Sequence, residues 1–387
     1  MKLLFFMLPY YGHINPTLSV AEELVRRGEQ VVYYTTEAFA GKIDSTGAEI
    51  RILGEEFGFR MEEVVDGRLT VALRSGDFYV ENLRRHVDKA SELLERVREE
   101  KADGVVCDPM CLWGRTVAER LELPRALFFS GIAVTADSPV FDYFSKLFDG
   151  DIPQIVTDMF LKSEPLMLAP IPREFQPDSE LLADTFEFIG PTIVDRGSET
   201  DFPFGEIDGH PTILISLGSV LHNPQFYDLC VEAFADTRWK VVMVSKTSPE
   251  KVPANFLIYP FVPQLNILQH AKLFISHGGV NSVMESLWYG VPLLMVPQSS
   301  DQPLVAARAE ALNLGRKLEL ATLTSSQLLE SAKEVLANPA ILEGVQQMQS
   351  ILHNGGGSKR GADVIQQYFE ETNLVRKVIS TPPLYEN

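Results

Sequence analysis

The sequence predicts an α/β protein with two domains, each built around a parallel sheet. The chain has 387 residues, which is more than one hydrophobic core usually serves. In both halves, short apolar segments alternate with segments of helical periodicity, the pattern of strands joined by helices. Residues 190–211 are rich in Gly, Pro and acidic residues and have no sustained period. We therefore expect a first domain over residues 1–200 and a second over residues 201–364.

The first half begins with a repeated strand and helix pattern. Strands are expected at Leu3–Leu8, Gln30–Thr35 and Glu49–Leu53, and helices at Thr17–Arg27 and Ala38–Ser45. Pro16 suits the first turn of a helix, and Gly28 suits a left-handed helix end. Ligands of parallel sheets bind beyond the carboxyl ends of the strands, so the turn that contains His13 is expected to face a crevice.

Residues 54–77 break this periodicity, yet they contain Phe57 and Phe59, so we expect a pocket wall rather than a solvated loop. The next elements expected are a helix over Tyr79–Glu100 and strands over Gly104–Cys107 and Leu127–Ser130. Asp108 follows a strand directly, which places its carboxylate at the same crevice as His13.

The segment Phe141–Phe160 is dense in aromatic residues, and this density has two interpretations. It is usual for a core, and the functional alternative is an apolar pocket for a ligand. Within the segment, Asp149-Gly150-Asp151 has the D-x-D spacing of a metal site known from a different fold. Because it follows no strand, we interpret it as a turn.

The second half resumes the alternation. Strands are expected at Thr212–Leu217, Trp239–Val244 and Leu257–Phe261, and helices at Leu265–Ala271, Pro303–Asn313, Ser325–Ala337 and Ala340–His353. The run Gly355–Lys359 lacks the preceding strand and the spacing of a phosphate-binding P-loop. We expect its glycines to end one helix and Ser358 to cap the next.

The stretch 261–302 carries the clearest functional pattern. It predicts a strand over Leu273–Ser276, a turn at His277-Gly278-Gly279, a helix over Val280–Trp288 and a strand over Pro292–Val296. The glycines let the backbone approach a ligand, and the first amides of the helix are unpaired at its positive end. This geometry predicts an anion site, with phosphate as the expected ligand. Asn281 and Ser282 add donors, and Glu285 lies one turn further on the same face, where it can hold a ribose diol.

Composition limits the classes of partner and compartment. A net charge of -19 and a pI near 4.8 oppose binding to nucleic acid or to an anionic membrane. Cys107, Cys111 and Cys230 form neither a disulfide framework nor a metal-ligand set. The apolar start is short, is interrupted by Pro9 and lacks a cleavage site, so a buried strand explains it better than a signal peptide. No apolar stretch approaches the ~20 residues that span a bilayer. We expect a soluble, cytoplasmic monomer or homodimer.

The pattern F-V-P-Q, then H-G-G-x-N-S-x-x-E, then D-Q resembles the donor signature of UDP-sugar glycosyltransferases, most closely the bacterial macrolide group. The resemblance implies the GT-B fold, in which two Rossmann-like domains face each other across a cleft. It also implies that residues 365–387 pack back on the first domain. The donor-binding residues expected from it are Gly218, Ser219, Phe261, Val262, Gln264, His277, Gly279, Val280, Asn281, Ser282, Glu285, Asp301 and Gln302.

Within that set, the first segment would cradle uracil, His277 and the helix start would hold the diphosphate, and Glu285 the ribose. Asp301 and Gln302 would read the sugar, expected to be glucose. Diphosphate binding by helix amides implies that no metal or other cofactor is required. The apolar acceptor is expected to be a macrolide, a flavonoid or another phenolic, and its binding residues to be Tyr11, Phe57, Phe59, Met110, Phe141 and Phe144.

His13 is the expected general base, because histidine titrates near neutral pH and the turn G-H-x-N-P matches the catalytic turn of the family. Asp108 would orient its ring and stabilise the imidazolium. Attack opposite the phosphate would invert the sugar carbon. A glycoside hydrolase would need two carboxylates at one bond. A nucleotide-sugar epimerase of the same architecture, or a non-catalytic sugar-nucleotide-binding protein, remains an alternative.

Overall fold

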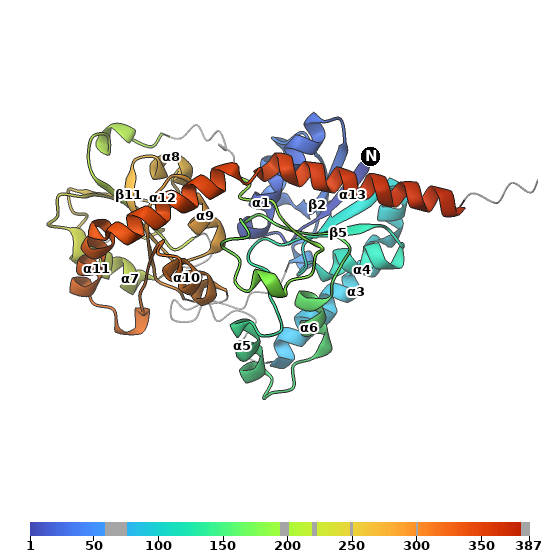
Figure 1. The fold of residues 1–387 in the computed structure, drawn as a ribbon, viewed down its shortest axis with the longest axis horizontal. Coiled ribbons are helices and arrows are strands. Elements are labelled where there is room, and N and C mark those ends of the chain that lie inside the picture. The colour runs from blue at the N-terminus through green and yellow to red at the C-terminus, as the bar shows by residue number, and fades with distance from the viewer. Residues whose placement is uncertain (59–75, 194–200, 219–222, 248–250, 299–300, 381–387) are drawn as a thin grey trace, which may run out of the picture.

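The computed structural model of the protein describes residues 1–58, 76–193, 201–218, 223–247, 251–298 and 301–380. Two parallel sheets lie in separate halves of the molecule, which confirms the predicted α/β class (Figure 1). The first sheet is buried on both faces, because Leu3 and Phe5 lie in one hydrophobic cluster and Leu4 and Phe6 lie in another.

The first sheet has the strand order β3-β2-β1-β4-β5-β6-β7. Its strands are β1 (Lys2–Phe6), β2 (Gln30–Thr36), β3 (Glu49–Leu53), β4 (Gly104–Cys107), β5 (Arg125–Phe128), β6 (Met167–Ala169) and β7 (Phe186–Phe188). The helices of this half are α1 (Tyr11–Arg26), α2 (Glu37–Asp44), α3 (Gly76–Glu100), α4 (Leu112–Arg120), α5 (Pro139–Leu147) and α6 (Gln154–Leu161). The strand order reverses between β1 and β4, and this switch point opens a crevice at the carboxyl end of the sheet.

The second sheet has the order β10-β9-β8-β11-β12-β13 and a switch point between β8 and β11. Its strands are β8 (Thr212–Ser216), β9 (Lys240–Val244), β10 (Phe256–Tyr259), β11 (Ala271–Ser276), β12 (Leu293–Met295) and β13 (Gly315–Lys317). The helices are α7 (Pro224–Phe234), α8 (Gln264–Leu268), α9 (Val280–Trp288), α10 (Gln302–Ala311), α11 (Ser325–Ala337), α12 (Pro339–Asn354) and α13 (Gly357–Ser380). Short 3₁₀ turns occur at Glu55–Phe57, Ser179–Leu181, Phe204–Glu206 and Leu320–Thr322.

Local sequence signals explain several helix starts. The Asn223 side chain accepts a hydrogen bond from the Phe226 amide at the start of α7. Thr324 and Gln327 form a reciprocal capping box at the start of α11. The prediction that Ser358 caps the last helix was wrong, because α13 begins at Gly357 and Ser358 lies inside it.

Helix α1 begins earlier than predicted. It starts at Tyr11 rather than at Thr17 and includes Pro16 in its interior. A proline lacks the N–H that an interior helical position donates, which is why the pattern predicted Pro16 at the first turn. The correction places His13 in the first turn of a helix instead of in a loop.

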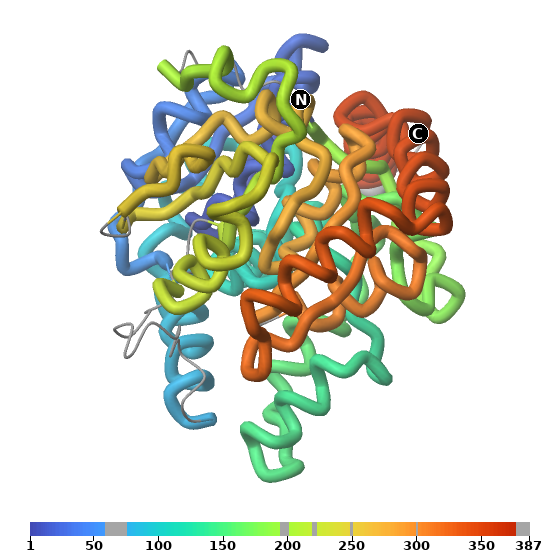
Figure 2. The backbone as a smooth tube through the Cα atoms, turned by 90° about the vertical axis from the view of Figure 1, so that its left-hand side faces the viewer, coloured from blue at the N-terminus to red at the C-terminus, as the bar shows by residue number. Residues whose placement is uncertain are grey.

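The last helix crosses from the second sheet to the first. Ile365 and Phe369 of α13 are fully buried in the same cluster as Leu3. Tyr368 donates a hydrogen bond to the Arg125 carbonyl at 3.0 Å. Figure 1 shows α13 running across the first half, and Figure 2 shows it in red at one side of the molecule.

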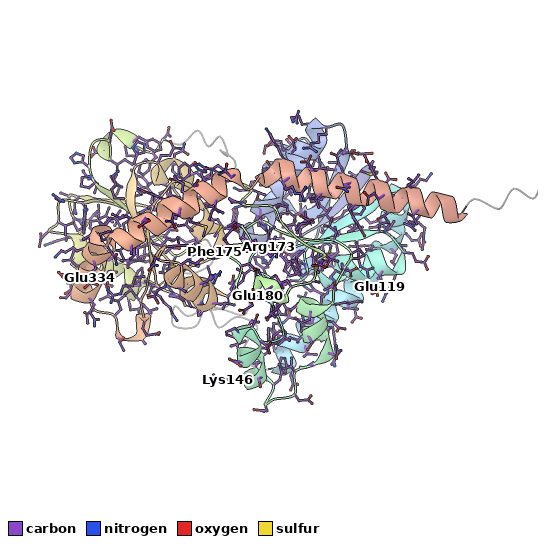
Figure 3. The ribbon with its side chains drawn as sticks, viewed as in Figure 1. Glu119, Lys146, Arg173, Phe175, Glu180 and Glu334 are labelled. Atoms are coloured by element: carbon purple, nitrogen blue, oxygen red, sulfur yellow. The ribbon has the colours of Figure 1, made fainter. Side chains whose placement is uncertain are left out.

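A second contact joins the two halves near the middle of the molecule, where Figure 3 labels Phe175. Phe175 belongs to the first half of the chain but is fully buried in the hydrophobic cluster of the second sheet. The Arg308 guanidinium on α10 donates to the carbonyls of Phe175 at 3.0 Å and Glu174 at 2.8 Å. The two halves are therefore held together at a point distinct from the α13 crossing.

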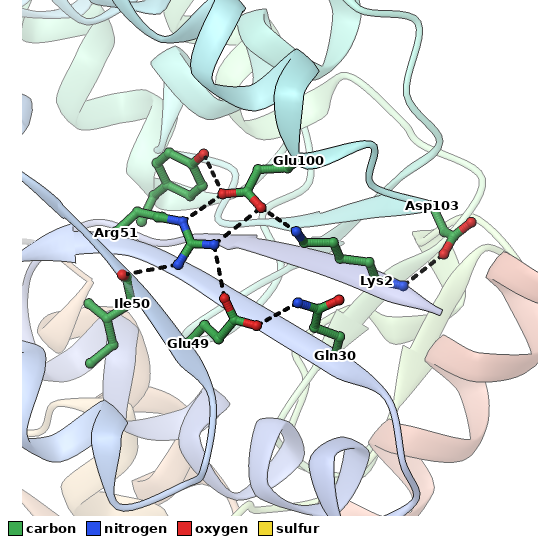
Figure 4. A network of polar contacts seen from close by, with 8 residues as sticks. Lys2, Gln30, Glu49, Ile50, Arg51, Glu100 and Asp103 are labelled. Atoms are coloured by element: carbon green, nitrogen blue, oxygen red, sulfur yellow. Dashed lines mark hydrogen bonds and ion pairs between the residues drawn. The ribbon is translucent and has the colours of Figure 1, made fainter.

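Glu100 ties three elements together at the edge of the first sheet (Figure 4). Its side chain is 9% exposed and accepts hydrogen bonds from Arg51 on β3, at 2.6 Å, and from Lys2 on β1. The Tyr34 hydroxyl also donates to it, at 3.4 Å. Burial raises the pKa of the Glu100 carboxyl, but the hydrogen bonds and charges of Arg51 and Lys2 together lower it by more. The net pKa therefore lies below the ordinary 4.5.

We expect Glu100→Gln to lower the free energy of unfolding at pH 7 by about 1–3 kcal/mol, because it leaves the partly exposed cations of Arg51 and Lys2 with a weaker, uncharged acceptor. A depressed carboxyl pKa stabilises the fold above the unfolded value and loses that effect as pH falls through the folded value. The difference between the proteins should therefore shrink in acid. Urea denaturation at pH 7 and pH 4 measures both effects. Glu334→Gln, which removes an exposed pair with Arg316, is the control and should cost at most about 0.5 kcal/mol. Equal costs for the two substitutions would contradict the assignment.

Candidate active site

The predicted catalytic pair meets at the switch point of the first sheet. β1 and β4 are parallel neighbours, so the residues that follow them lie side by side. The Nδ1 atom of His13, on the first turn of α1, is hydrogen-bonded to Oδ2 of Asp108. The other carboxylate oxygen accepts from the Met110 amide at 2.7 Å, which fixes the orientation of the carboxylate. Asp108 is buried, while the His13 side chain is 21% exposed.

The surroundings of His13 raise its pKa and fix its tautomer. Burial lowers the pKa of His13, but the charge and hydrogen bond of Asp108 and the charge of Asp301 raise it more, so the net pKa lies above the ordinary 6.5. Nδ1 faces a carboxylate oxygen, which places a proton on Nδ1. In the described part of the chain, Nε2 has no hydrogen-bond partner. Nε2 is therefore the atom available to accept a proton.

Sequence reasoning missed Ser130 at this site. Its hydroxyl oxygen lies 3.1 Å from Nδ1 of His13. The prediction placed Ser130 inside a strand, whereas β5 ends at Phe128, so Ser130 lies beyond the carboxyl end of the strand. The signal that could have found it is its position after β5, the neighbour of β4.

The second sheet presents its predicted anion site at its own switch point. Gly218 follows β8 and His277 follows β11, two parallel neighbours. A Cβ built on Gly218 would lie 2.9 Å from Cε1 of His277, and one on Gly279 would lie 2.5 Å from Nε2. The Nε2–Cε1 edge of the ring is thus packed against two glycines, and a larger residue at either position would displace it. Ser219 lies outside the described residues.

His277 is neutral at physiological pH. Burial lowers its pKa to about 4, although its hydrogen bond to the Ser216 carbonyl acts in the opposite direction. Since one ring nitrogen donates to Ser216, the other would donate to a phosphate only after taking up a proton. The positive potential at this site therefore comes from the first amides of α9, which begins at Val280 as predicted.

The remaining predicted donor residues gather around α9. Phe261 follows β10 and is 68% exposed, so its ring face is open to a planar ligand, while Val262 beside it is buried. Gln264 donates to Oε2 of the buried Glu285 at 2.6 Å. This bond joins the two segments that are predicted to hold the uracil and the ribose.

Asp301 and Gln302 lie at the start of α10 but differ in their surroundings. Gln302 is buried, and its side-chain oxygen accepts from the Gln298 amide at 2.9 Å. Asp301 faces the first half, because its Oδ2 would lie 3.7 Å from a Cβ built on Gly131. The same Cβ would lie 3.4 Å from Val280 of α9. The start of α10, the start of α9 and the loop after β5 therefore converge.

Comparisons with known proteins agree with this geometry. Residues 205–356 match the sequence profile of the family described as "UDP-glucoronosyl and UDP-glucosyl transferase". Over 384 residues the chain is 32% identical to the NDP-glycosyltransferase YjiC of Bacillus subtilis, covering 94% of this chain and 96% of that protein. The chain belongs to the UDP-glycosyltransferase family. It is also 27% identical to the oleandomycin glycosyltransferase of Streptomyces antibioticus, over 93% of this chain and 89% of that protein.

The fold comparison supports the same conclusion. The solved structure of CalG4, the calicheamicin glycosyltransferase, is similar with a TM-score of 0.79 and 28% identity, over 95% of this chain and 98% of that chain. The protein is thus a glycosyltransferase with the GT-B fold, as the sequence predicted. The family favours glycosyl transfer over the epimerase and the non-catalytic binding protein that the sequence left open.

The predicted acceptor residues of this glycosyltransferase have mixed surroundings. Tyr11 is 41% exposed and packs edge-on against Phe39. Phe57 is 5% exposed and packs against Trp113, so core packing alone accounts for it. Phe59 lies outside the described residues.

The aromatic segment of the glycosyltransferase forms a small core of its own. Phe144 is buried, and Phe141 and Met110 are partly buried against the same cluster, which joins α3, α5 and α6. Met110 lies two residues from Asp108, so this cluster adjoins the predicted catalytic pair. The acceptor roles of Phe141 and Phe144 stay predictions.

No metal or membrane site is found in the described parts of the glycosyltransferase. Among those residues no group of three His, Cys, Asp or Glu side chains is placed to hold a metal ion. Asp149 and Gly150 form a left-handed turn between α5 and α6, as predicted. None of the described helices combines the length and the apolar character needed to cross a membrane. A cleft of about 770 Å³, lined by residues from 172–190 and 347–355, includes none of the predicted site residues.

Proposed function

We propose that this glycosyltransferase moves glucose from UDP-glucose to a hydroxyl of a hydrophobic small molecule, with inversion at the sugar carbon. The observation that carries the proposal is the pairing of His13 with Asp108 opposite the start of α9. A macrolide, a flavonoid or another phenolic is the proposed acceptor class. The match to the oleandomycin glycosyltransferase supports a macrolide-like molecule within this class.

In the proposed mechanism, Nε2 of His13 accepts the proton of the acceptor hydroxyl. The hydroxyl oxygen forms a bond to the anomeric carbon as the bond from that carbon to the diphosphate oxygen breaks. Asp108 stabilises the imidazolium that forms, and the amides of α9 stabilise the departing UDP without reorganising. Because attack occurs opposite the leaving group, an α-linked donor gives a β-linked product.

Release of UDP with and without acceptor tests the reaction class. We expect release to depend on a hydroxylated aromatic or macrolide, and mass spectrometry to find one hexose added to it. UDP release of equal rate without any acceptor would indicate hydrolysis instead. Conversion of the sugar nucleotide without UDP release would indicate an epimerase.

The nucleotide preference is the first specific prediction of the proposed function. We expect isothermal titration to show tighter binding of UDP than of ADP or GDP, because the proposed base site at Phe261 and Val262 is uncharged and the exposed Phe261 ring offers a face for stacking. Thymidine diphosphate belongs in the comparison, because the spinosyn rhamnosyltransferase SpnG, which shares the fold at 19% identity and a TM-score of 0.72, was solved with it. Equal affinity for all four nucleotides would remove the base site from the proposal.

Metal independence is the second prediction. We expect turnover in excess EDTA to match turnover in magnesium within a factor of about two, reflecting ionic strength alone. The reason is that the amides at the start of α9 provide the positive potential for the diphosphate. Assays after exhaustive chelation measure it. Complete loss of turnover that a single divalent ion restores would overturn the prediction.

A further inference from the structure

Pro16 leaves one backbone carbonyl of α1 without its usual partner. In an α-helix the carbonyl of residue i accepts from the amide of residue i+4, and proline has no N–H. Helix α1 includes Pro16, so the Gly12 carbonyl lacks the helical donor four residues ahead. Gly12 immediately precedes His13. An acceptor is therefore available beside the proposed base.

The second domain supplies the missing donor. Nδ2 of Asn281 donates a hydrogen bond to the Gly12 carbonyl at 2.9 Å. Asn281 lies on the first turn of α9, the helix whose amides form the proposed diphosphate site. A Cβ built on Gly12 would lie 3.8 Å from the same nitrogen, so the Asn281 side chain lies against the Gly12 backbone. Figure 1 shows α1 and α9 at the facing edges of the two halves.

We propose that Pro16, Gly12 and Asn281 form an interdomain latch that aligns His13 with the bond to be broken. The two reacting groups belong to different domains, and a misplacement of about 1 Å can cost 10²-fold in rate. Asn281 is suited to this role because an amide donates to a carbonyl without adding charge. A cationic side chain at this position would disfavour the imidazolium that forms on His13. Asn281 is thus a positioning residue as well as an expected donor ligand.

The latch sets alignment rather than holding the domains together. Arg308 and α13 make their contacts elsewhere, through the Phe175 carbonyl and the core of the first sheet. Loss of a single hydrogen bond at Gly12 leaves these contacts in place. Its loss is therefore expected to lower turnover while the fold persists.

Pro16→Ala is the sharpest test, because it adds the amide that competes for the Gly12 carbonyl. We expect kcat at saturating donor and acceptor to fall roughly 10- to 100-fold. UDP affinity should stay unchanged and the melting temperature should not fall, since α1 gains a hydrogen bond. Pro339→Ala is the matched control: Pro339 is the first residue of α12, where an amide has no partner within the helix, and the Val335 carbonyl four residues before it already accepts from the Asn338 amide, so kcat should not change.

The double variant separates the latch from other effects of proline. Asn281→Ala is expected to change both kcat and the KM for the donor, because it removes the latch and a donor contact together. If the latch operates, Pro16→Ala lowers kcat no further in the Asn281→Ala background. An equal loss in both backgrounds, or an unchanged kcat in Pro16→Ala alone, would overturn the proposal. A fall in melting temperature that accounts for the lost activity would overturn it too.

This inference rests on the proposed role of His13. The two are distinguishable, because His13→Ala reports on the base and the double variant reports on the coupling between Pro16 and Asn281. If His13→Ala leaves turnover intact, the base is wrong, and kcat of the double variant still decides whether the latch exists.

Discussion

His13→Ala is expected to lower the transfer rate by roughly 10²- to 10⁴-fold, the usual worth of a positioned general base. The reason is geometric, since Nδ1 is engaged by Asp108 and Nε2 is left to accept the acceptor proton. UDP affinity should stay nearly unchanged, because the predicted donor contacts come from the second sheet and its helices. Single-turnover kinetics and titration with UDP measure the two quantities separately.

Acceptors that are already ionised provide the control for this variant. Acidic phenols and thiols need no base, so they should recover much of the rate lost in His13→Ala. If the variant instead binds UDP poorly or melts at a lower temperature, and ionised acceptors give no rescue, then His13 is a structural residue and the proposed mechanism fails.

Asp108→Asn extends the same test to the pH dependence of the reaction. Only the neutral form of His13 accepts a proton, so kcat/KM should rise with pH through the raised pKa of this residue. Replacing the carboxylate removes the charge and the strong hydrogen bond that hold this pKa up, and the rise should move to lower pH. Turnover should fall because the imidazolium loses its counter-charge. Since the two residues act as a unit, the double variant should be far less than additive.

The sequence predicted this pair because each residue lies just beyond the carboxyl end of a strand, and the two strands prove to be neighbours. Asp108 follows β4 directly, and His13 lies in the segment that follows β1, so both reach the carboxyl edge where β1 and β4 meet. The same reasoning predicted Gly218 and His277 after β8 and β11. These strands have four to six residues, most of them buried, and glycine-containing turns follow β8 and β11, so both kinds of element can be recognised from the local sequence.

Other features depend on tertiary context that no local pattern contains. The strands β6, β7 and β13 have three residues each, which is too short for a period to show. The start of α1 was predicted too late in the sequence, because a proline in a helix normally leaves one carbonyl without its donor. The sequence around Pro16 does not show that another residue supplies this donor. The donor comes from Asn281, 269 residues away in sequence. Ser130 was hidden by an error of two residues at the end of β5.

Gly279→Ala is expected to weaken UDP binding by roughly 10- to 100-fold, the loss of about one charge-assisted hydrogen bond. The backbone of Gly279 has φ −65° and ψ 137°, which alanine adopts without strain, so the effect is purely steric. The added Cβ would lie 2.5 Å from Nε2 of His277. The ring also lies against Gly218, so either the ring or the start of α9 must move.

Titration calorimetry with UDP measures this effect, and Gly41→Ala is the matched control. Gly41 lies on α2, and a Cβ there would meet no atom within 4 Å. UDP binding should not change in that variant, and the fold should gain slightly in stability from a better helix former. If Gly279→Ala binds UDP with wild-type affinity, then the position of the His277 ring and of the start of α9 beside Gly279 is not required for diphosphate binding.

Making Gly279→Ala in a protein that already carries His277→Ala shows whether the added methyl group displaces the imidazole or the start of α9. If the clash with the imidazole is the cause, Gly279→Ala should cost no further affinity once the ring is removed, because the space that the ring occupied accepts the methyl. If the methyl instead moves the first amides of α9, the loss should be the same in both backgrounds. The helix amides and the imidazole are both predicted diphosphate ligands. Comparing the loss of UDP affinity caused by Gly279→Ala in the wild-type and His277→Ala proteins determines which of the two depends on a glycine at position 279.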